Sequence, residues 1–224
     1  VQVLKTLDHP NIIQFMGYVE TPPTYIVVLE YCSGGDVYTA LRKGTPPRFF
    51  QNVANGLVAG MSHMHAHSII HRDLKSSNLL LDVDAWSMGG FAVKLIDFGV
   101  ARHVTGLNSE ELTTETGTYR WMAPEVICHE EYSAPADVFS FGMVLYELLT
   151  HEVPHADLGP IQAAMATGLQ GVLPPLPNGT PSAIEALIRA CWTSPPSARP
   201  TFEELVNSLL PQLESTLLPA EVLW

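Results

Sequence analysis

The sequence predicts an α+β fold in which a small strand-containing part precedes a larger helical part. Residues 12–20 and 25–31 are rich in β-branched and aromatic side chains, and Thr21-Pro22-Pro23 separates them. This pattern predicts two antiparallel strands joined by a turn. From Asp36 onward the apolar residues mostly follow helical spacing. Residues 32–35 (CSGG) form a flexible connector, so we expect the boundary between the two parts there.

Helices are predicted on both sides of this connector. Residues 1–7 have apolar side chains at helical spacing, and a His-Pro-Asn sequence ends the pattern. Asp36 can cap a short helix that runs to Arg42. A longer helix is predicted over about residues 47–67. Its apolar stripe consists of Phe50, Val53, Leu57, Met61 and Met64.

The second half is expected to contain two short strands followed by helices. The strands lie near residues 79–81 and 92–96, and helices separated by Pro and Gly loops begin at Pro124. The last helix is predicted to begin after Thr201, a good cap, and to end near Pro211.

Composition excludes several classes of protein. The 224 residues contain 11 basic and 23 acidic side chains and have a net charge of −12, which argues against a nucleic-acid-binding surface. No apolar run approaches the roughly 20 residues that cross a bilayer, so we expect no membrane segment in this chain. Cys32, Cys128 and Cys191 are odd in number and widely spaced, which indicates a reduced intracellular protein without disulfides or a zinc site.

Three motifs carry the chemistry. They are residues 71–78 (HRDLKSSN), residues 97–99 (DFG) and residues 123–125 (APE), in that order along the chain. The chain resembles the protein kinase family, and the resemblance extends over essentially all 224 residues. Residues 117–122 (GTYRWM) look like the substrate-docking loop of tyrosine-kinase-like serine/threonine kinases, the Raf-like and mixed-lineage groups.

The resemblance implies the bilobal protein kinase fold, with a nearly complete helical C-lobe. Residues 1–31 would be the end of the N-lobe, namely the last part of helix αC and two strands, and residues 32–35 the hinge. Residues 36–214 would be the C-lobe, with the catalytic loop at 71–78 and the activation segment at 97–125. Residues 215–224 would be a C-terminal tail.

The resemblance also implies catalytic roles. Phosphoryl transfer depends on positioning and on neutralising the charge of the phosphate. Asp73 would accept the proton of the substrate hydroxyl, and Lys75 would lie against the γ-phosphate of ATP. Asn78 and Asp97 would supply the oxygen ligands of Mg²⁺, or of Mn²⁺ as a substitute.

Other matched positions would bind the nucleotide or connect the lobes. Leu29 falls at the gatekeeper position, the backbone of Glu30 and Cys32 would bond the adenine edge, and Leu80 would pack beneath the base. The side chains expected to stack into a spine through both lobes are Leu4, Phe15, His71 and Phe98.

Two further matches concern architecture. Glu125 is expected to form a partly buried salt bridge with Arg199. Asp137, on a buried helix, is expected to hold the backbone of the turn at His71 and Arg72.

Substrate class and regulation follow from the same segment. Serine/threonine kinases usually carry a lysine at the position of Lys75, and Thr118 would bond both Lys75 and Asp73. The candidate activating phosphorylation sites are Thr113, Thr114 and Thr116, and Arg72 could pair with a phosphate there. These features imply an intracellular signalling enzyme in the cytoplasm, or on the cytoplasmic side of a larger membrane protein. Its partners would be protein substrates and an upstream activating kinase.

A cluster of histidines suggests a metal site that we reject. The four are His63, His65, His67 and His71. Of these, only His63 and His67 share a helix face, and no carboxylate or cysteine is evidently placed to complete four ligands.

Some parts of the family pattern are not present. The sequence contains no Gly-rich phosphate loop or strand lysine, and the αC glutamate would fall immediately before Val1. We therefore expect an N-terminally truncated kinase domain that by itself transfers phosphate poorly and aggregates readily. The alternatives are a pseudokinase that acts as a scaffold or allosteric partner, and a tyrosine or dual-specificity kinase.

Overall fold

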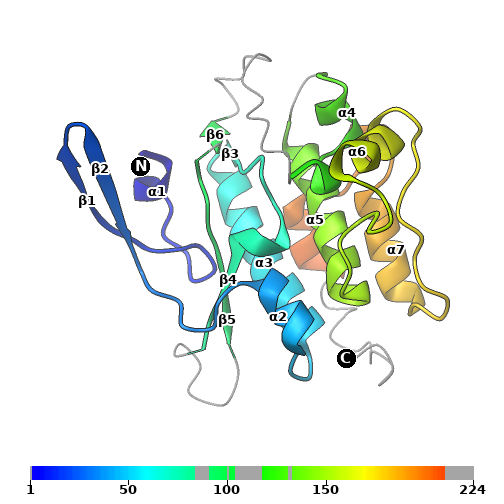
Figure 1. Cartoon of the computed structure of the whole chain (residues 1–224), viewed down its shortest axis with the longest axis horizontal. Coiled ribbons are helices and arrows are strands. Elements are labelled where there is room, and N and C mark those ends of the chain that lie inside the picture. Colours follow the sequence, from blue (N-terminus) through cyan, green and yellow to red (C-terminus); the bar gives the residue numbers. More distant parts are fainter. Residues whose placement is uncertain (1, 84–90, 100, 104–117, 131–132, 210–224) are drawn as a thin grey trace.

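The structure is a computed structural model that describes residues 2–83, 91–99, 101–103, 118–130 and 133–209. A two-stranded hairpin and a short helix lie at one side of the molecule, and most of the helices gather at the other (Figure 1). Short strands lie between these two groups. The predicted α+β organisation is therefore present. Among the described helices, none is long and apolar enough to cross a lipid bilayer.

The hairpin consists of β1 (Phe15–Thr21) and β2 (Thr24–Leu29), which pair antiparallel around the predicted proline turn. It is preceded by the short helix α1 (Gln2–Thr6). The first strand begins later than predicted because residue Ile12 pairs elsewhere, forming a parallel bridge with Leu95. All six residues of β2 are exposed in this two-stranded sheet.

Two helices follow the connector. Helix α2 (Val37–Lys43) is capped as predicted, because the side chain of Asp36 accepts a hydrogen bond from the backbone amide of Thr39 at 2.7 Å. Helix α3 (Phe49–Ala66) begins slightly later than predicted, after Arg48 in a left-handed conformation. The whole predicted apolar stripe of α3 is buried in the main core.

Two small sheets connect the helices. Strand β4 (Leu79–Asp82) pairs antiparallel with β5 (Ala92–Leu95), and β3 (Ile69–Ile70) pairs with β6 (Arg102–His103). The β4–β5 register places Leu79 opposite Leu95. The residues just before β4 and just after β5 are therefore neighbours.

The remaining helices pack around α5 (Ala134–Thr150), which is buried from Ala136 to Leu149. A helix buried on all sides must be apolar throughout, as this one nearly is. The other α-helices of this half are α4 (Pro124–Ile127), α6 (Pro160–Gly168), α7 (Ser182–Cys191) and α8 (Phe202–Glu204). The short 3₁₀ turns are η1 (Ser76–Asn78), η3 (Thr118–Trp121) and η4 (Pro196–Ala198).

The last helix differs from the prediction. Thr201 does cap it, accepting a hydrogen bond from the amide of Glu204 at 3.1 Å. However, the α-helix covers only Phe202–Glu204 and is followed by a π-helical turn, η5 (Leu205–Leu209). The predicted stop at Pro211 and the predicted tail lie outside the described residues.

Close packing of α5 against α7 predicts a destabilising substitution at Gly142. A β-carbon there would lie 2.7 Å from Nε1 of Trp192 and 2.8 Å from Cβ of Cys191. We expect Gly142→Ala to lower the free energy of unfolding by about 1–3 kcal/mol, because overpacking outweighs the better helix propensity of alanine. Urea denaturation would measure this, with Gly17→Ala as control, since a β-carbon at Gly17 meets nothing within 4 Å. A Gly142→Ala protein as stable as the wild type would contradict the packing described here.

Candidate active site

The catalytic loop is held by one buried carboxylate. Asp137 of α5 is completely buried, and its two oxygens accept hydrogen bonds from the backbone amides of His71 (2.8 Å) and Arg72 (2.9 Å). Nε2 of His65 lies 2.9 Å from Oδ2 of the same carboxylate. Burial opposes the charge, but the bonds from His65 and His71 hold the pKa of Asp137 below its usual range. The predicted anchoring of the turn is therefore present.

Three of the predicted catalytic side chains meet in the loop itself. Nζ of Lys75 lies 2.8 Å from Oδ2 of Asp73. Nδ2 of Asn78 donates to the same oxygen at 2.9 Å and to the backbone carbonyl of Asp73 at 2.8 Å. These contacts fix the plane of the Asp73 carboxylate and direct its other oxygen, Oδ1, away from Lys75 and Asn78.

The fourth predicted residue, Asp97, reaches the loop through the β4–β5 pairing. The backbone amide of Ile96 donates to the carbonyl of Asn78 at 3.0 Å, and Nε2 of His71 lies 3.0 Å from the carbonyl of Ile96. Asp97 follows directly, with a positive φ of 64°, and its side chain is exposed. A non-glycine residue in this conformation costs roughly 1 kcal/mol or more. The surrounding contacts must therefore offset that cost.

The substrate-docking turn contacts the loop through Thr118. Nζ of Lys75 donates to Oγ1 of Thr118 at 3.0 Å, and Thr118 is buried. The expected second bond, from Thr118 to Asp73, differs from what the structure shows. Within the described part of the chain, Oδ1 of Asp73 is buried without a hydrogen-bond partner. It lies at a narrow crevice between the loop and the turn that Thr118, Trp121 and Ser140 also line.

The donor set suits a hard divalent cation. The amide nitrogen of Asn78 faces Asp73, which leaves its oxygen for a ligand, and the carboxylate of Asp97 is exposed. Mg²⁺ is usually held by one or two carboxylates and by substrate phosphates rather than by an all-protein cage. The described residues contain no group of three or more His, Cys, Asp or Glu side chains that could hold a metal ion.

A small second core brings together two residues predicted to contact the nucleotide, Cys32 and Leu80, and three of the predicted spine residues. It contains Leu4, Ile13 and Cys32, with the predicted residues Phe15, Leu80 and Phe98 packed against it. The ring of Phe98 meets that of His71 edge-to-face, with centroids 5.5 Å apart. The four side chains predicted to form a spine thus lie in one continuous set of contacts.

In the hinge segment, the hydrogen bonds of Glu30 determine which backbone group could contact an adenine base. The amide of Glu30 donates to the carbonyl of Gln14 at 3.0 Å, so its own carbonyl is the group left to contact an adenine. Its side chain pairs with Lys94 at 2.8 Å. Leu29 lies at the end of β2, and burial raises the pKa of the Cys32 thiol to about 11.

The predicted architectural ion pair is also present. Arg199 and Glu125 form a buried bidentate pair, with nitrogen–oxygen distances of 2.6 and 2.9 Å. It joins α4, just after the docking turn, to the segment before α8. By contrast, the candidate phosphorylation sites Thr113, Thr114 and Thr116 lie outside the described residues.

The four clustered histidines have different partners. His65 contacts Asp137, and His71 contacts the backbone of Ile96. His63 and His67 stack on each other with ring centroids 4.4 Å apart, and Nδ1 of His67 lies 2.8 Å from the carbonyl of His63. Their directions do not converge on one point.

Two contacts near the site were not predicted from the sequence. Glu147 of α5 is buried and accepts hydrogen bonds from Ser76 and Trp121. Arg120 donates to backbone carbonyls of the loop before α6, at Pro154, His155 and Leu158. A signal for Glu147 did exist, because it and Asp137 are the only charged residues in α5.

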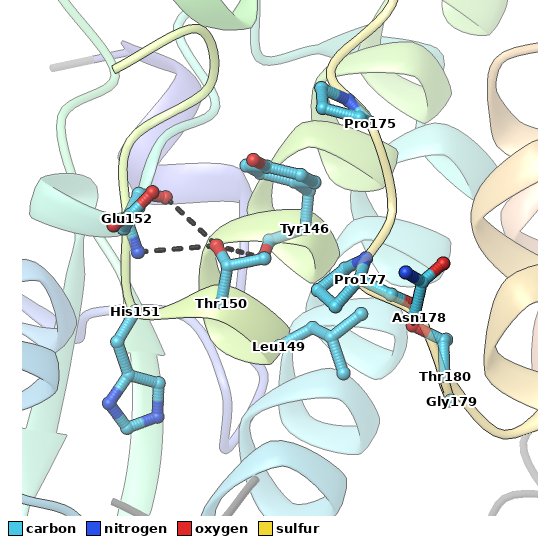
Figure 2. A pocket seen from close by; sticks show the side chains of 10 residues that line it. All are labelled: Tyr146, Leu149, Thr150, His151, Glu152, Pro175, Pro177, Asn178, Gly179 and Thr180. Atoms are coloured by element: carbon cyan, nitrogen blue, oxygen red, sulfur yellow. Dashed lines mark hydrogen bonds between the residues drawn. The ribbon is translucent and has the colours of Figure 1, made fainter. Parts of the chain in front are cut away.

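A larger pocket lies elsewhere. It has a volume of about 500 Å³ and opens between the end of α5 and residues 175–180 (Figure 2). Its walls include Tyr146, Leu149, Glu152 and Pro177. None of the residues lining it was predicted to take part in catalysis or binding. The residues predicted to take part in catalysis therefore lie outside this pocket.

The chain is similar in sequence to known protein kinases. Residues 1–210 match the family described as protein kinase domain. Serine/threonine-protein kinase STY17 of Arabidopsis thaliana is 41% identical over 212 residues, covering 93% of this chain and 36% of that protein. Serine/threonine/tyrosine-protein kinase HT1 of the same organism is 40% identical over 213 residues, covering 93% and 53%. Mitogen-activated protein kinase kinase kinase 12 of Rattus norvegicus is 37% identical over 211 residues, covering 93% and 23%. The chain thus spans only part of the length of each relative.

The buried acid Glu147 predicts a pH-dependent difference in stability. Burial raises its pKa from 4.5 to about 7, despite the bonds from Ser76 and Trp121. The folded protein therefore binds a proton between these pH values that the unfolded chain has released, so this group's contribution to stability falls as pH rises through that window. Relative to the wild type, Glu147→Gln should gain stability from pH 4.5 to 7, by an amount on the order of 3 kcal/mol.

Urea denaturation of both proteins across this pH range would measure the difference. Glu204→Gln should show the opposite sign, and below pH 4.5 instead, because hydrogen bonds from Thr201 lower the pKa of Glu204 in the folded protein. A constant difference between Glu147→Gln and the wild type would contradict the raised pKa.

Proposed function

The chain belongs to the protein kinase family, and from this we propose that it carries the catalytic centre of a serine/threonine kinase that transfers the γ-phosphate of ATP to protein substrates. The observation that carries the proposal is the position of the Lys75 ammonium group. It contacts the carboxylate of Asp73 at 2.8 Å and the hydroxyl of Thr118 at 3.0 Å, so one cation joins the catalytic loop to the docking turn.

Proton transfer is assigned to Oδ1 of Asp73. The other oxygen of this carboxylate is engaged by Lys75 and Asn78, whereas Oδ1 has no hydrogen-bond partner among the described residues. A substrate hydroxyl that approaches this carboxylate could donate its hydrogen bond to Oδ1 and lose its proton there as the new phosphate ester forms. Lys75 would stabilise the negative charge of the transferred phosphoryl group.

Residues of the proposed site can also be assigned to the metal ion and to the nucleotide. Asn78 and Asp97 would hold Mg²⁺, or Mn²⁺ in its place, which supplies charge neutralisation on the phosphates of ATP. Leu29 and Leu80 would enclose the base, and the backbone of Glu30 and Cys32 would bind its edge. Members of the family generally use ATP and Mg²⁺.

The two alternatives are a pseudokinase and a kinase of dual specificity. A pseudokinase does not require Lys75 and Asn78 to contact the carboxylate of Asp73. In this protein both side chains do so. Dual specificity is favoured by the relative HT1, which is named a serine/threonine/tyrosine-protein kinase. The Lys75–Thr118 contact supports serine/threonine specificity as the first choice.

We also propose a place in signalling. Phosphate added to Thr113, Thr114 or Thr116 by an upstream kinase would order the activation segment, with Arg72 as its partner. Relatives named as kinases of a mitogen-activated cascade are in line with protein substrates and such an activator. Free cysteines at Cys32, Cys128 and Cys191 support a reducing compartment, and we assign the protein to the cytoplasm.

Substitution of the two catalytic aspartates tests the proposal. In the full-length protein with Mg·ATP and dephosphorylated casein, Asp73→Asn should lower kcat by about 10²- to 10⁴-fold, because the base is lost. Asp97→Asn should lower activity at least as much, because a metal ligand is lost. The exposed Asp157 provides the control Asp157→Asn. Retained activity in both catalytic variants would contradict the assignment, and phosphoamino-acid analysis of the casein would decide between serine/threonine and dual specificity.

Substitution of the three activation-segment threonines tests the proposed regulation by phosphorylation. We expect the triple variant Thr113→Ala, Thr114→Ala and Thr116→Ala to lose most of the activity of the full-length protein after incubation with ATP, since no phosphate can be added at these positions. Mass spectrometry of the wild type should find phosphate on at least one of the three. Full activity of the triple variant would show that this segment needs no phosphorylation there.

A further inference from the structure

Three histidine rings pack together where the segment before β1 meets the end of α3. The ring of His63 contacts that of His9, with centroids 5.0 Å apart, and that of His67, with centroids 4.4 Å apart. His63 lies in the last turn of α3, His67 is the residue that caps this helix, and His9 belongs to the loop after α1. Contacts between these rings therefore join two segments that are far apart in the sequence.

The hydrogen bond of His9 requires the neutral form of its ring. The backbone amide of Asn11 donates to Nδ1 of His9 at 3.1 Å, so this nitrogen carries no proton. A charged imidazolium ring donates from both of its nitrogens and cannot accept such a bond. Protonation of His9 would place two N–H groups face to face, and the ring and the amide of Asn11 would have to separate.

The surroundings of His63 also favour a neutral ring. Its Nε2 atom is buried and has no hydrogen-bond partner within the described residues. In the charged form this nitrogen would be a buried N–H group without an acceptor. Two charged rings at the observed distances would also repel each other. The packed arrangement is therefore most stable when its rings are uncharged.

The charged groups near the rings have opposite effects. Burial is the largest cause that lowers the pKa of His9 and of His63 from the ordinary value of 6.5, and a neighbouring histidine lowers both further. Lys94 of β5 also lowers the pKa of His9, although its ammonium group is paired with Glu30. Asp8 favours the charged form of both rings, but its side chain is exposed and water screens its charge.

Asn11 connects the histidines to α3 and β5. It packs closely on α3 at Gly60, where a β-carbon would lie 3.1 Å from the carbonyl oxygen of Asn11. Its Nδ2 atom donates to the carbonyl of Val93 at 2.9 Å, and its own carbonyl accepts from the amide of Leu95 at 2.9 Å. Strand β5 ends at Leu95, two residues before Asp97. These bonds therefore join the histidines to the strand that leads to a predicted metal ligand.

We propose that His9, His63 and His67 form a pH-sensitive latch, which holds residues 9–13 against α3 and β5 at neutral pH and releases them in acid. In the released state the rings titrate with the ordinary pKa of 6.5, whereas in the closed latch His9 and His63 have lower pKa values. The released state therefore binds more protons, so the latch is most stable above pH 6.5 and weakens as the pH falls below that value. The latch does not require phosphate transfer.

Hydrogen exchange of the full-length protein at pH 7.5 and pH 5.5 tests the latch. Mass spectrometry of peptides that contain residues 9–13 and 93–96 would give their protection factors, corrected for the intrinsic effect of pH on exchange. In acid, protection should fall by at least about threefold, with an upper limit of about tenfold for each histidine that the release exposes. Helix α7 contains no histidine, and its protection should not change.

Variants that cannot be protonated should lose this dependence on pH. His9→Asn keeps an acceptor for the amide of Asn11, because an asparagine side chain can bond the backbone amide two residues on. His63→Phe keeps an aromatic ring without a titratable nitrogen. Each single variant should show a smaller fall than the wild type, and the double variant should show none. The control His129→Asn removes an exposed histidine outside the latch and should behave as the wild type.

Three results would overturn the latch. The first is equal protection of residues 9–13 at both pH values in the wild type. The second is an equal fall in α7, which would show unfolding of the whole helical part and not release of one segment. The third is a fall of wild-type size in both single variants. None of these measurements needs kinase activity, so failure of the latch and failure of the proposed function are separate results.

Discussion

The position of the catalytic loop depends on the buried carboxylate of Asp137. A charge without solvent is costly unless several hydrogen bonds stabilise it. Here the amides of His71 and Arg72 and the ring of His65 all contact the same side chain. Because two of these donors are backbone groups, the carboxylate fixes the course of the main chain immediately before Asp73.

Helix α5 extends this constraint to the rest of the site. It is surrounded by other elements for almost its whole length, so it cannot shift without disturbing the main core. Asp137 anchors the catalytic loop, Ser140 anchors the backbone of the docking turn, and Glu147 contacts both. The polar residues that interrupt this apolar helix are thus the ones through which the core positions the chemistry.

The predicted site residues differ in exposure: Asn78 is buried and the side chain of Asp73 is mostly buried. Asp97 is exposed, and it adopts a backbone conformation that asparagine or glycine would adopt more readily. It is held there by short-range pairing of β4 with β5 and by the contact between His71 and Ile96. Asp97 thus combines a rigid support with a carboxylate that is open to solvent.

The sequence alone determined the fold class and the approximate positions of the hairpin and of helices α2 and α3, but it did not predict the short strands β3 and β6. Helical spacing located α3, β-branched residues located the hairpin, and ordered motifs identified Asp73, Asn78 and Asp97. It also predicted the Glu125–Arg199 and Asp137 contacts, because the family resemblance pairs those positions. Boundaries were less well determined: the first strand starts at Phe15 because Ile12 pairs with Leu95, a partner far away in the chain.

Only the tertiary structure decided which atoms meet. Among the described residues the predicted hydrogen bond from Thr118 to Asp73 is not formed, Arg120 binds the loop before α6, and Glu147 links Ser76 to Trp121. Periodicity reports which residues are buried, but a hydrogen bond between distant segments depends on distances of a few tenths of an ångström and on side-chain direction. Those quantities follow from how helices pack around α5, and no local pattern of residues encodes them.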